Sequence, residues 1–346
     1  MLILGLESSC DETACAIVEN GSRVLSGVIS SQVKAHSPYG GVVPELASRL
    51  HVEKIIPVID KCLDEAGLRL EDMDAFSVTA GPGLIGSLLV GMETAKSIAY
   101  VMKKPLAPVH HIAAHLYTPF LDFPGNEVPE DFDYPYLGLV VSGGHSSLIL
   151  VRDSLTYERI GRTLDDAAGE AFDKVAKLLE LGYPGGPVID RLSEFGNPEH
   201  VRFPRPGSKS DKPDLSFSGL KTAVVRHVRN GKATGEVAED SVEDLAASFQ
   251  AAVIDTLVEK TRRALQVTGV RRLAVVGGVA CNRSLRKAIA SAYNGIDLHI
   301  PPPALCTDNA YMIAGLGYHV LKSGVKAPLD LNADAGLDLL KPVLFK

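Results

Sequence analysis

Two histidines four residues apart, His111 and His115, are the residues whose spacing first indicates chemistry. On a helix both side chains lie on one face with Cβ atoms about 5–6 Å apart, so two imidazoles can share one divalent ion. A zinc-protease helix needs Glu directly after the first histidine, and Ile112 stands there. The alternative is a pair of hydrogen-bonded structural histidines, since the adjacent His110 shows that histidines cluster here. The spacing alone predicts half a metal site and does not support metalloprotease chemistry.

A carboxylate far along the chain can complete such a site. Asp308 follows three consecutive prolines and precedes a helical pattern that runs from Tyr311 to Leu321. This position predicts a helix start with Thr307 as a candidate N-cap. Alone, Asp308 is interpreted as a helix cap; beside two histidines it supplies the third ligand of a His/His/Asp metal site.

An acidic bend lies between the first two apolar segments. Residues 2–6 and 14–18 are apolar and flank a polar bend that contains Asp11 and Glu12. The hairpin signal Asn20-Gly21 follows, so the start of the chain predicts a three-strand meander. The bend either presents carboxylates and backbone N–H groups to a ligand or is a solvated turn.

Glycine-rich turns follow two further apolar strands. Residues 74–79 predict a strand that leads through Gly81-Pro-Gly83 into a helix over residues 84–102, and residues 273–276 begin a second unit of this kind. Free N–H groups and the helix dipole make such a turn a ready anion site. Neither a P-loop nor a dinucleotide fingerprint is present around the first turn, so a purely structural turn is the alternative.

The opening pattern recurs in the second half of the chain. Residues 137–141 and 147–151 are apolar and flank another small polar bend, as an ancient duplication would produce. This repetition predicts an α/β fold of two ribonuclease-H-like lobes that face each other across a nucleotide-binding cleft. We expect lobes at 1–133 and 134–309, with 310–346 packing back on the first.

Two acidic residues of the second half lie beside glycine turns. Asp173 belongs to a segment that reads as a helix over residues 165–174, in which Asp166 is seven residues earlier and therefore on the same face. Asp190 follows Tyr183-Pro-Gly-Gly-Pro187, a turn that opens another helix. Acidic residues on helices are usually solvated, so only the neighbouring glycines favour a ligand-binding role.

Composition limits the class of protein. A chain of 346 residues predicts two domains. It has no apolar run of a membrane span's length, and its first residues lack the basic start and cleavage site of a signal peptide, so we expect a cytoplasmic protein without membrane contact. Five scattered cysteines without a C-x-x-C pair argue against a Cys-ligated zinc or an iron–sulfur cluster.

The net charge of −7 excludes a globally basic nucleic-acid binder. Any such binding needs a helper protein or a local patch, for which the basic stretch 201–232 is the candidate; an ordinary surface loop is the alternative. Within that stretch we expect Lys209, Lys212 and Lys221 to contact phosphates.

Ten sequence blocks occur in an order that resembles the universal family of tRNA threonylcarbamoyladenosine synthases, whose bacterial form was once called O-sialoglycoprotein endopeptidase. The blocks cover essentially the whole chain: Gly5–Thr13, Gly41–Arg49, Gly81–Gly91, His111–His115, Val141–His145, Asp165–Lys174, Tyr183–Pro187, Phe217–Thr222, Gly277–Arg283 and Cys306–Asn309.

The resemblance implies an actin/Hsp70/sugar-kinase-like fold and a group transfer. Threonylcarbamoyl would move from threonylcarbamoyl-AMP to N6 of adenosine 37 in tRNAs that read codons starting with A. By position, His111, His115 and Asp308 would hold one Fe²⁺ or Zn²⁺ per subunit. The nucleotide part of the donor would be held by Val140, Val141, Ser142, Gly143, Gly144, Asp173, Gly186, Asp190 and Asn282.

The resemblance also implies partners, namely tRNA, a paralogous pseudo-enzyme subunit that forms a heterodimer, and a small P-loop ATPase. Asp11 and Glu12 are our candidates to orient or deprotonate the adenine amine, from their chemistry and their place in the first bend. Two alternatives remain: an ATPase or kinase on the same fold, which leaves the His/His/Asp set unexplained, and a non-catalytic scaffold, which predicts lost motif residues.

Overall fold

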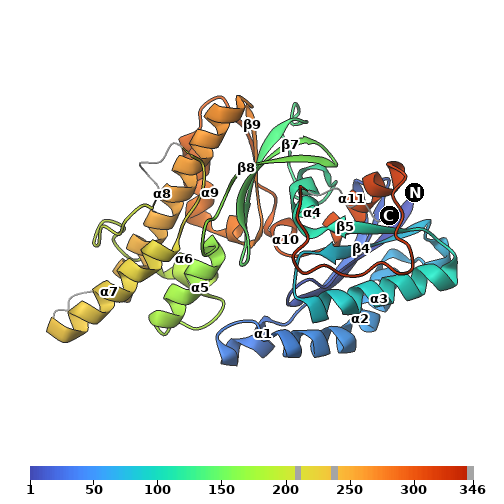
Figure 1. The fold of residues 1–346 in the computed structure, drawn as a ribbon, viewed down its shortest axis with the longest axis horizontal. Coiled ribbons are helices and arrows are strands. Elements are labelled where there is room, and N and C mark those ends of the chain that lie inside the picture. Colours follow the sequence, from blue (N-terminus) through green and yellow to red (C-terminus); the bar gives the residue numbers. More distant parts are fainter. Residues whose placement is uncertain (207–211, 235–240, 341–346) are drawn as a thin grey trace. The chain divides into compact units, whose positions relative to one another are not determined.

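The computed structural model describes residues 1–206, 212–234 and 241–340, which fall into two compact units (Figure 1). Unit 1 comprises Met1–Val128, Arg152–Tyr157 and Pro301–Lys346, and unit 2 comprises Pro129–Val151 and Glu158–Ile300. The lobe boundaries expected from the sequence placed residues 301–309 in the second lobe, whereas in the structure these residues belong to unit 1. Asp308 therefore belongs to the same unit as His111 and His115.

Unit 1 is built on a five-stranded sheet in the order β3-β2-β1-β4-β5. The strands are β1 (Leu2–Glu7), β2 (Glu12–Glu19), β3 (Arg23–Ser31), β4 (Ala75–Gly81) and β5 (Leu106–His110). The first three form an antiparallel meander, which confirms the prediction, and β1, β4 and β5 run parallel. Because parallel strands end at the same edge, this sheet brings Glu7, Gly81 and His110 to one edge.

Helices cover both faces of this sheet. The long helices α2 (Pro44–Ala66) and α3 (Ile85–Met102) pack on one face, around alternate strand residues such as Leu4, Phe76 and Val78 (Figure 1). The intervening strand residues belong to a second core, which contains side chains of α4 (His111–Tyr117) and α11 (Ala310–Lys322). The period-2 alternation of strand side chains separates the two cores.

The C-terminal segment, which follows α11, crosses the edge of the sheet at which the parallel strands end. The backbone N–H of Asp334 donates to the carbonyl of Ala80 (2.9 Å), and that of Gly83 donates to Ala335 (3.3 Å). A Cβ on Gly81 would lie 1.9 Å from the carbonyl oxygen of Asp334. Glycine is therefore required where the segment passes β4.

The sheet of unit 2 has the order β10-β9-β6-β7-β8, which repeats the order of unit 1 when read from β8 to β10. In it β6 takes the central place of β1. The strands are β6 (Tyr136–Val141), β7 (Ser146–Asp153), β8 (Thr156–Arg162), β9 (Arg272–Val276) and β10 (Asp297–His299). β6 pairs antiparallel with β7 and parallel with β9, so the predicted second meander and the strand before the second glycine turn are confirmed.

The helices of unit 2 are only partly those expected. They are α5 (Ala168–Leu178), α6 (Gly185–Leu192), α7 (Ser218–Thr234), α8 (Val242–Thr268) and α9 (Arg283–Ala292). The buried α8, 27 residues long, was not among the predicted elements.

The predicted helix over residues 165–174 begins only at Ala168, because Ala167 has extended backbone (ψ 161°). Asp166 precedes the helix, so the expectation that it shares a face with Asp173 was wrong. Among the residues described, no helix combines the length and the apolar composition that crossing a bilayer requires.

His110 caps the helix that carries the paired histidines. Its Nδ1 accepts from the backbone N–H groups of Ile112 (3.1 Å) and Ala113 (3.4 Å), and its Nε2 donates to the carbonyl of Leu337 (3.1 Å). Since Nδ1 accepts, the ring proton must lie on Nε2. His110 thus joins the start of α4 to the C-terminal segment.

Replacing this cap tests its role. We expect His110→Ala to lower the free energy of unfolding by about 1 kcal/mol, because two N–H groups lose their acceptor, whereas His110→Asn keeps a capping oxygen and should lose less than half as much. Urea unfolding of the two variants measures the difference. Equal losses would show that packing of the ring, and not capping, is what matters.

Candidate metal centre

His111, His115 and Asp308 converge at one point in unit 1. Oδ1 of Asp308 lies 3.1 Å from Nε2 of His115 and 3.4 Å from Nε2 of His111, and the ligand atoms of the three residues all lie within 4.8 Å of one another. The two imidazole rings meet edge to face, with centroids 4.7 Å apart. The predicted metal set is therefore brought together.

The local fold explains this convergence. β5 ends at His110 and α4 begins at once, so both histidines project from the first turns of a helix anchored at a sheet edge. Asp308 lies in the short connection between α10 (Pro303–Cys306) and α11. The N-cap of α11 is Asn309, whose side chain accepts from the N–H of Met312 (3.0 Å), so the expectation of a cap at Thr307 was wrong. Asp308 is thereby left free to face the histidines.

The charges of this cluster are strongly coupled. Burial by itself lowers the pKa of His111, but the negative charges of Asp308 and Glu7 more than offset it, so this pKa lies well above its usual value. Burial lowers the pKa of His115. Burial raises the pKa of Asp308, yet the two histidines reverse this effect and hold it below its usual value. The cluster favours a positive charge at its centre.

The donor set fits a divalent transition metal. Imidazole nitrogen and carboxylate oxygen are the ligands that Zn²⁺ and Fe²⁺ accept, and three protein ligands leave coordination positions open, as in catalytic sites. In addition, the buried Nδ1 of His115 has no hydrogen-bond partner within the described chain. On both histidines Nε2 faces Asp308, so a nitrogen of each ring points toward the place where an ion could bind.

A second acidic residue, missed by sequence reasoning, adjoins the cluster. Glu7 is 1% exposed at the end of β1, and its Oε2 lies 3.0 Å from Nδ1 of His111. Burial raises its pKa, but the interaction with His111 outweighs burial and lowers it. The sequence feature that could have indicated Glu7 is its position as the first acidic residue after an apolar strand.

Asp11 lies in the bend after β1 and Glu12 begins β2, both within the same unit. Glu12 accepts from the hydroxyl of Ser31 (3.1 Å). Its burial, followed by the charges of Asp11 and Asp308, raises its pKa to about 9, so Glu12 carries a proton at neutral pH. Burial likewise raises the pKa of the neighbouring Cys10 thiol well above its usual value, which disfavours a nucleophilic thiolate there.

The predicted nucleotide residues all lie in unit 2: Val140 to Gly144 lie at and after the end of β6, Asn282 follows the turn after β9, and the others belong to α5 and α6. β6 ends at Val141 and continues into the bend Ser142-Gly143-Gly144, while Gly277 follows β9 in register with it. A Cβ on Gly277 would lie 2.5 Å from the carbonyl oxygen of Val141, so the two turns are in close contact.

Several glycines of these turns border open space. A Cβ added to Gly143, Gly144, Gly186 or Gly278 would meet no heavy atom within 4 Å. Backbone N–H groups beside such openings are suited to phosphate and other anions.

The polar side chains of the predicted nucleotide set are partly committed to the fold. Asp173 accepts from the N–H of Gly185 (2.8 Å) at the start of α6. Asn282 caps α9 by accepting from Leu285 (2.8 Å). Asp190 accepts from the guanidinium of Arg283 (2.9 Å), while its Oδ1 is buried without a partner in the described chain. Asp190 is the residue of this set with an acceptor atom to spare.

The basic stretch is less cationic than its composition suggests. Lys221 lies 3.7 Å from Asp166, and Arg205 forms an ion pair with Asp255 (2.8 Å). Lys209 lies outside the described residues. A phosphate-binding role for the stretch stays a prediction.

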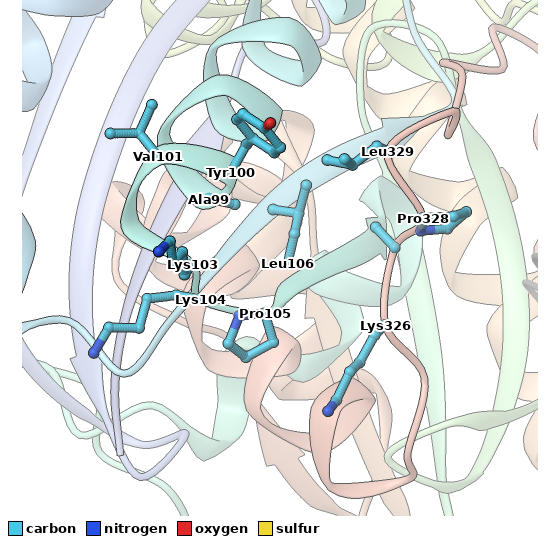
Figure 2. Close-up of a pocket in the computed structure, with 11 residues that line it drawn as sticks. Ala99, Tyr100, Val101, Lys103, Lys104, Pro105, Leu106, Lys326, Pro328 and Leu329 are labelled. Atoms are coloured by element: carbon cyan, nitrogen blue, oxygen red, sulfur yellow. The ribbon is translucent and has the colours of Figure 1, made fainter.

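A pocket of about 520 Å³ lies at the opposite end of β5 from the histidines. Figure 2 shows its walls, which are the last turn of α3 and residues 326–329, with Leu106 between them. Lys103, Lys104 and Lys326 line it, and none of the predicted site residues does. Ligands of parallel α/β sheets bind at the carboxyl ends of the strands, so this pocket is separate from the candidate site.

Comparison with known proteins gives the family. A model of the TsaD family, described as tRNA N6-adenosine threonylcarbamoyltransferase, matches residues 23–315. The chain belongs to this family. Proteins of that name from Symbiobacterium thermophilum and Bacillus subtilis are 52% and 48% identical to it, over 98% of this chain and 97% and 96% of theirs. The chain is accordingly a tRNA threonylcarbamoyltransferase, and the resemblance read from the ten blocks is confirmed.

Solved structures of low identity support the fold. Full-length HypF in its phosphate- and nucleotide-bound form matches with a TM-score of 0.59 at 14% identity, over 93% of this chain and 46% of that one. Component A of Acidaminococcus fermentans (R)-2-hydroxyglutaryl-CoA dehydratase matches with a TM-score of 0.56 at 15% identity, over 94% and 100%. With the family, these matches confirm the predicted two-lobed, sugar-kinase-like α/β fold.

The raised pKa of His111 predicts competition between metal and proton. Below that pKa, each bound divalent ion must displace a proton from His111, so the Zn²⁺ affinity should rise with pH, by up to about tenfold per pH unit. Chelator competition with Zn²⁺ from about pH 5.5 to 7.5 measures the slope. A Zn²⁺ affinity that does not change over this range would contradict the assignment of His111 as a ligand.

Proposed function

We propose that this threonylcarbamoyltransferase takes its acyl group from threonylcarbamoyl-AMP, delivers it to N6 of adenosine 37 in tRNAs that read codons starting with A, and uses one divalent metal, Fe²⁺ or Zn²⁺. His111, His115 and Asp308 would hold the metal. The observation that carries the metal dependence is the convergence of two imidazoles and a carboxylate from segments 193 residues apart, at the strand edge where ligands bind.

The reaction needs an activated carbonyl, because an exocyclic adenine amine is a poor nucleophile. The bound ion would supply Lewis acidity to an oxygen of the donor. The protein supplies the geometry: α4 fixes both histidines on one buried face, and Asp308 is held against them. Preorganised ligands of this kind need no rearrangement when charge develops.

The leaving group would be held by the glycine turns of unit 2. Attack by N6 forms a C–N bond at the carbamoyl carbon and breaks the bond to the phosphate oxygen, so AMP departs with both electrons of that bond. Open backbone at Gly143, Gly144 and Gly186 supports phosphate contact there.

The proton that N6 loses needs an acceptor. Of the two acids in the first bend, Glu12 is protonated at neutral pH because of its burial and the charge of Asp11. Asp11 is therefore the base in this proposal, and Glu12 is a neutral hydrogen-bond donor beside it. This divides a role that the sequence could assign only to the pair.

Protein partners would assist the transfer. The paralogous pseudo-enzyme subunit needs an apolar docking surface, and α2 exposes Val52 and Ile56, one turn apart, by 64% and 53%. With a net charge of −7, the chain would share tRNA binding with its partners, including a small P-loop ATPase.

Transfer of labelled threonine to tRNA, with the partner enzymes present, tests the proposed function. We expect His111→Ala to lose metal in elemental analysis and to transfer at least 100-fold more slowly, while His319→Ala, a histidine in α11 that hydrogen-bonds to Tyr117, keeps its metal. Full activity of a metal-free His111→Ala protein would refute the metal-dependent mechanism.

The two acids of the first bend should differ in effect. Asp11→Asn removes the base and should slow single-turnover transfer about 10²–10⁴-fold. Glu12→Gln preserves a neutral donor and should stay within about tenfold of wild type. Equal losses for both variants, or a near wild-type rate for Asp11→Asn, would remove this division of roles.

A further inference from the structure

Glu7 is a fully buried carboxylate that neither the metal set nor the transfer step uses. Its Oε1 accepts from the backbone N–H of Ser9 (2.5 Å), and its Oε2 accepts from the hydroxyl of Thr79 (2.6 Å) and faces Nδ1 of His111 (3.0 Å). Burying an ionised carboxylate is costly unless its oxygens are hydrogen-bonded. Three donors from three segments meet that requirement here.

Glu7 lies on the other side of His111 from Asp308. It faces Nδ1, whereas Asp308 faces Nε2 (3.4 Å), and the two nitrogens of an imidazole point in different directions. The group of residues able to share one ion contains His111, His115 and Asp308 but not Glu7. Glu7 is therefore placed to act on His111, and not on an ion directly.

We infer that Glu7 is a positioning residue: it accepts the Nδ1–H of His111 and thereby fixes the tautomer and ring orientation that leave Nε2 free for a divalent ion. This inference rests on the metal site of the proposed function. Histidines that bind metals almost always donate their second ring N–H in this way, and loss of the acceptor typically weakens metal binding 10–100-fold.

Competing acceptors at Nδ1 are weaker. The hydroxyl of Ser9 lies 3.3 Å from Nδ1, farther than Glu7, and it carries no charge. An anionic acceptor also makes the opposite nitrogen more basic, which a hydroxyl cannot do to the same degree.

The substitution Glu7→Gln tests the hydrogen bond with little change in volume. A glutamine has one acceptor oxygen and one donor NH₂, while the site presents N–H donors at both positions, from Ser9 and from His111. Either the NH₂ opposes Ser9, or it opposes His111 and favours the tautomer with its proton on Nε2. The second arrangement places a proton where the ion would bind.

Thr79→Val is the matched control. It removes another hydrogen bond to the same carboxylate, at similar side-chain volume, and leaves the contact between Glu7 and His111 in place. A merely structural role for the Glu7 pocket would make the two variants alike. A positioning role predicts that Glu7→Gln weakens Zn²⁺ binding and that Thr79→Val leaves it nearly unchanged.

The experiment measures Zn²⁺ affinity by chelator competition for wild type, E7Q and T79V, together with ¹⁵N-histidine NMR of the Zn²⁺-loaded wild-type protein. We expect a 10–100-fold loss for E7Q, a change below about threefold for T79V, and a His111 signal with the proton on Nδ1. The NMR measurement needs no variant, so it decides the question even if E7Q does not fold.

Three results would overturn the inference: E7Q binding Zn²⁺ within threefold of wild type, T79V losing as much as E7Q, or a Zn²⁺-loaded His111 that carries its proton on Nε2. In each of these cases wild type still binds Zn²⁺, so the metal site stands. A wild-type protein that binds no Zn²⁺ overturns the metal site itself and this role with it.

Discussion

A half-buried carboxylate held against two buried imidazoles is the interaction on which the candidate site depends. Asp308 faces His111 and His115, and His111 is also held by Glu7, so acidic and imidazole groups alternate in a row in which only Asp308 is partly exposed. Removing one member of such a set leaves a buried charge uncompensated, which typically costs several kcal/mol. The fold of unit 1 must therefore keep the end of β1, the start of α4 and the connection before α11 together.

The sheet accomplishes this by parallel pairing. β1, β4 and β5 deliver Glu7, Thr79 and His110 to one edge, and His110 fixes the first turn of α4 through its cap. The same strand order recurs in unit 2, where the corresponding edge carries glycine turns. One repeated framework thus carries two different sets of groups: imidazole and carboxylate suited to a metal ion in unit 1, and open backbone suited to an anion in unit 2.

Local signals in the sequence were sufficient for much of this. Short apolar segments and the Asn20-Gly21 turn predicted the first meander, and the His-x-x-x-His spacing with Asp308 predicted the metal set. Glu7 was missed because its role depends on strand pairing with residues about 70 and 100 positions away, which no local pattern encodes. The raised pKa of Glu12 likewise depends on its surroundings in the folded chain, which no local sequence pattern encodes.

Other errors came from element boundaries. The helix predicted from residue 165 starts at Ala168, because the preceding backbone is extended, and this displaced Asp166 from the face of Asp173. A single residue likewise separated the expected cap, Thr307, from the real one, Asn309. The position of the cap decides whether Asp308 is interpreted as part of a helix start or as a ligand. Capping geometry, unlike periodicity, is set by the backbone dihedrals of one position.

The most direct test of the central claim is anomalous diffraction at the zinc edge from crystals of the Zn²⁺-loaded protein. The account predicts one strong peak bounded by Nε2 of His111, a ring nitrogen of His115 and the carboxylate of Asp308, and its disappearance in His115→Ala crystals grown with Zn²⁺. A Zn²⁺ peak held by other residues, or one that persists unchanged in the His115→Ala protein, would contradict it.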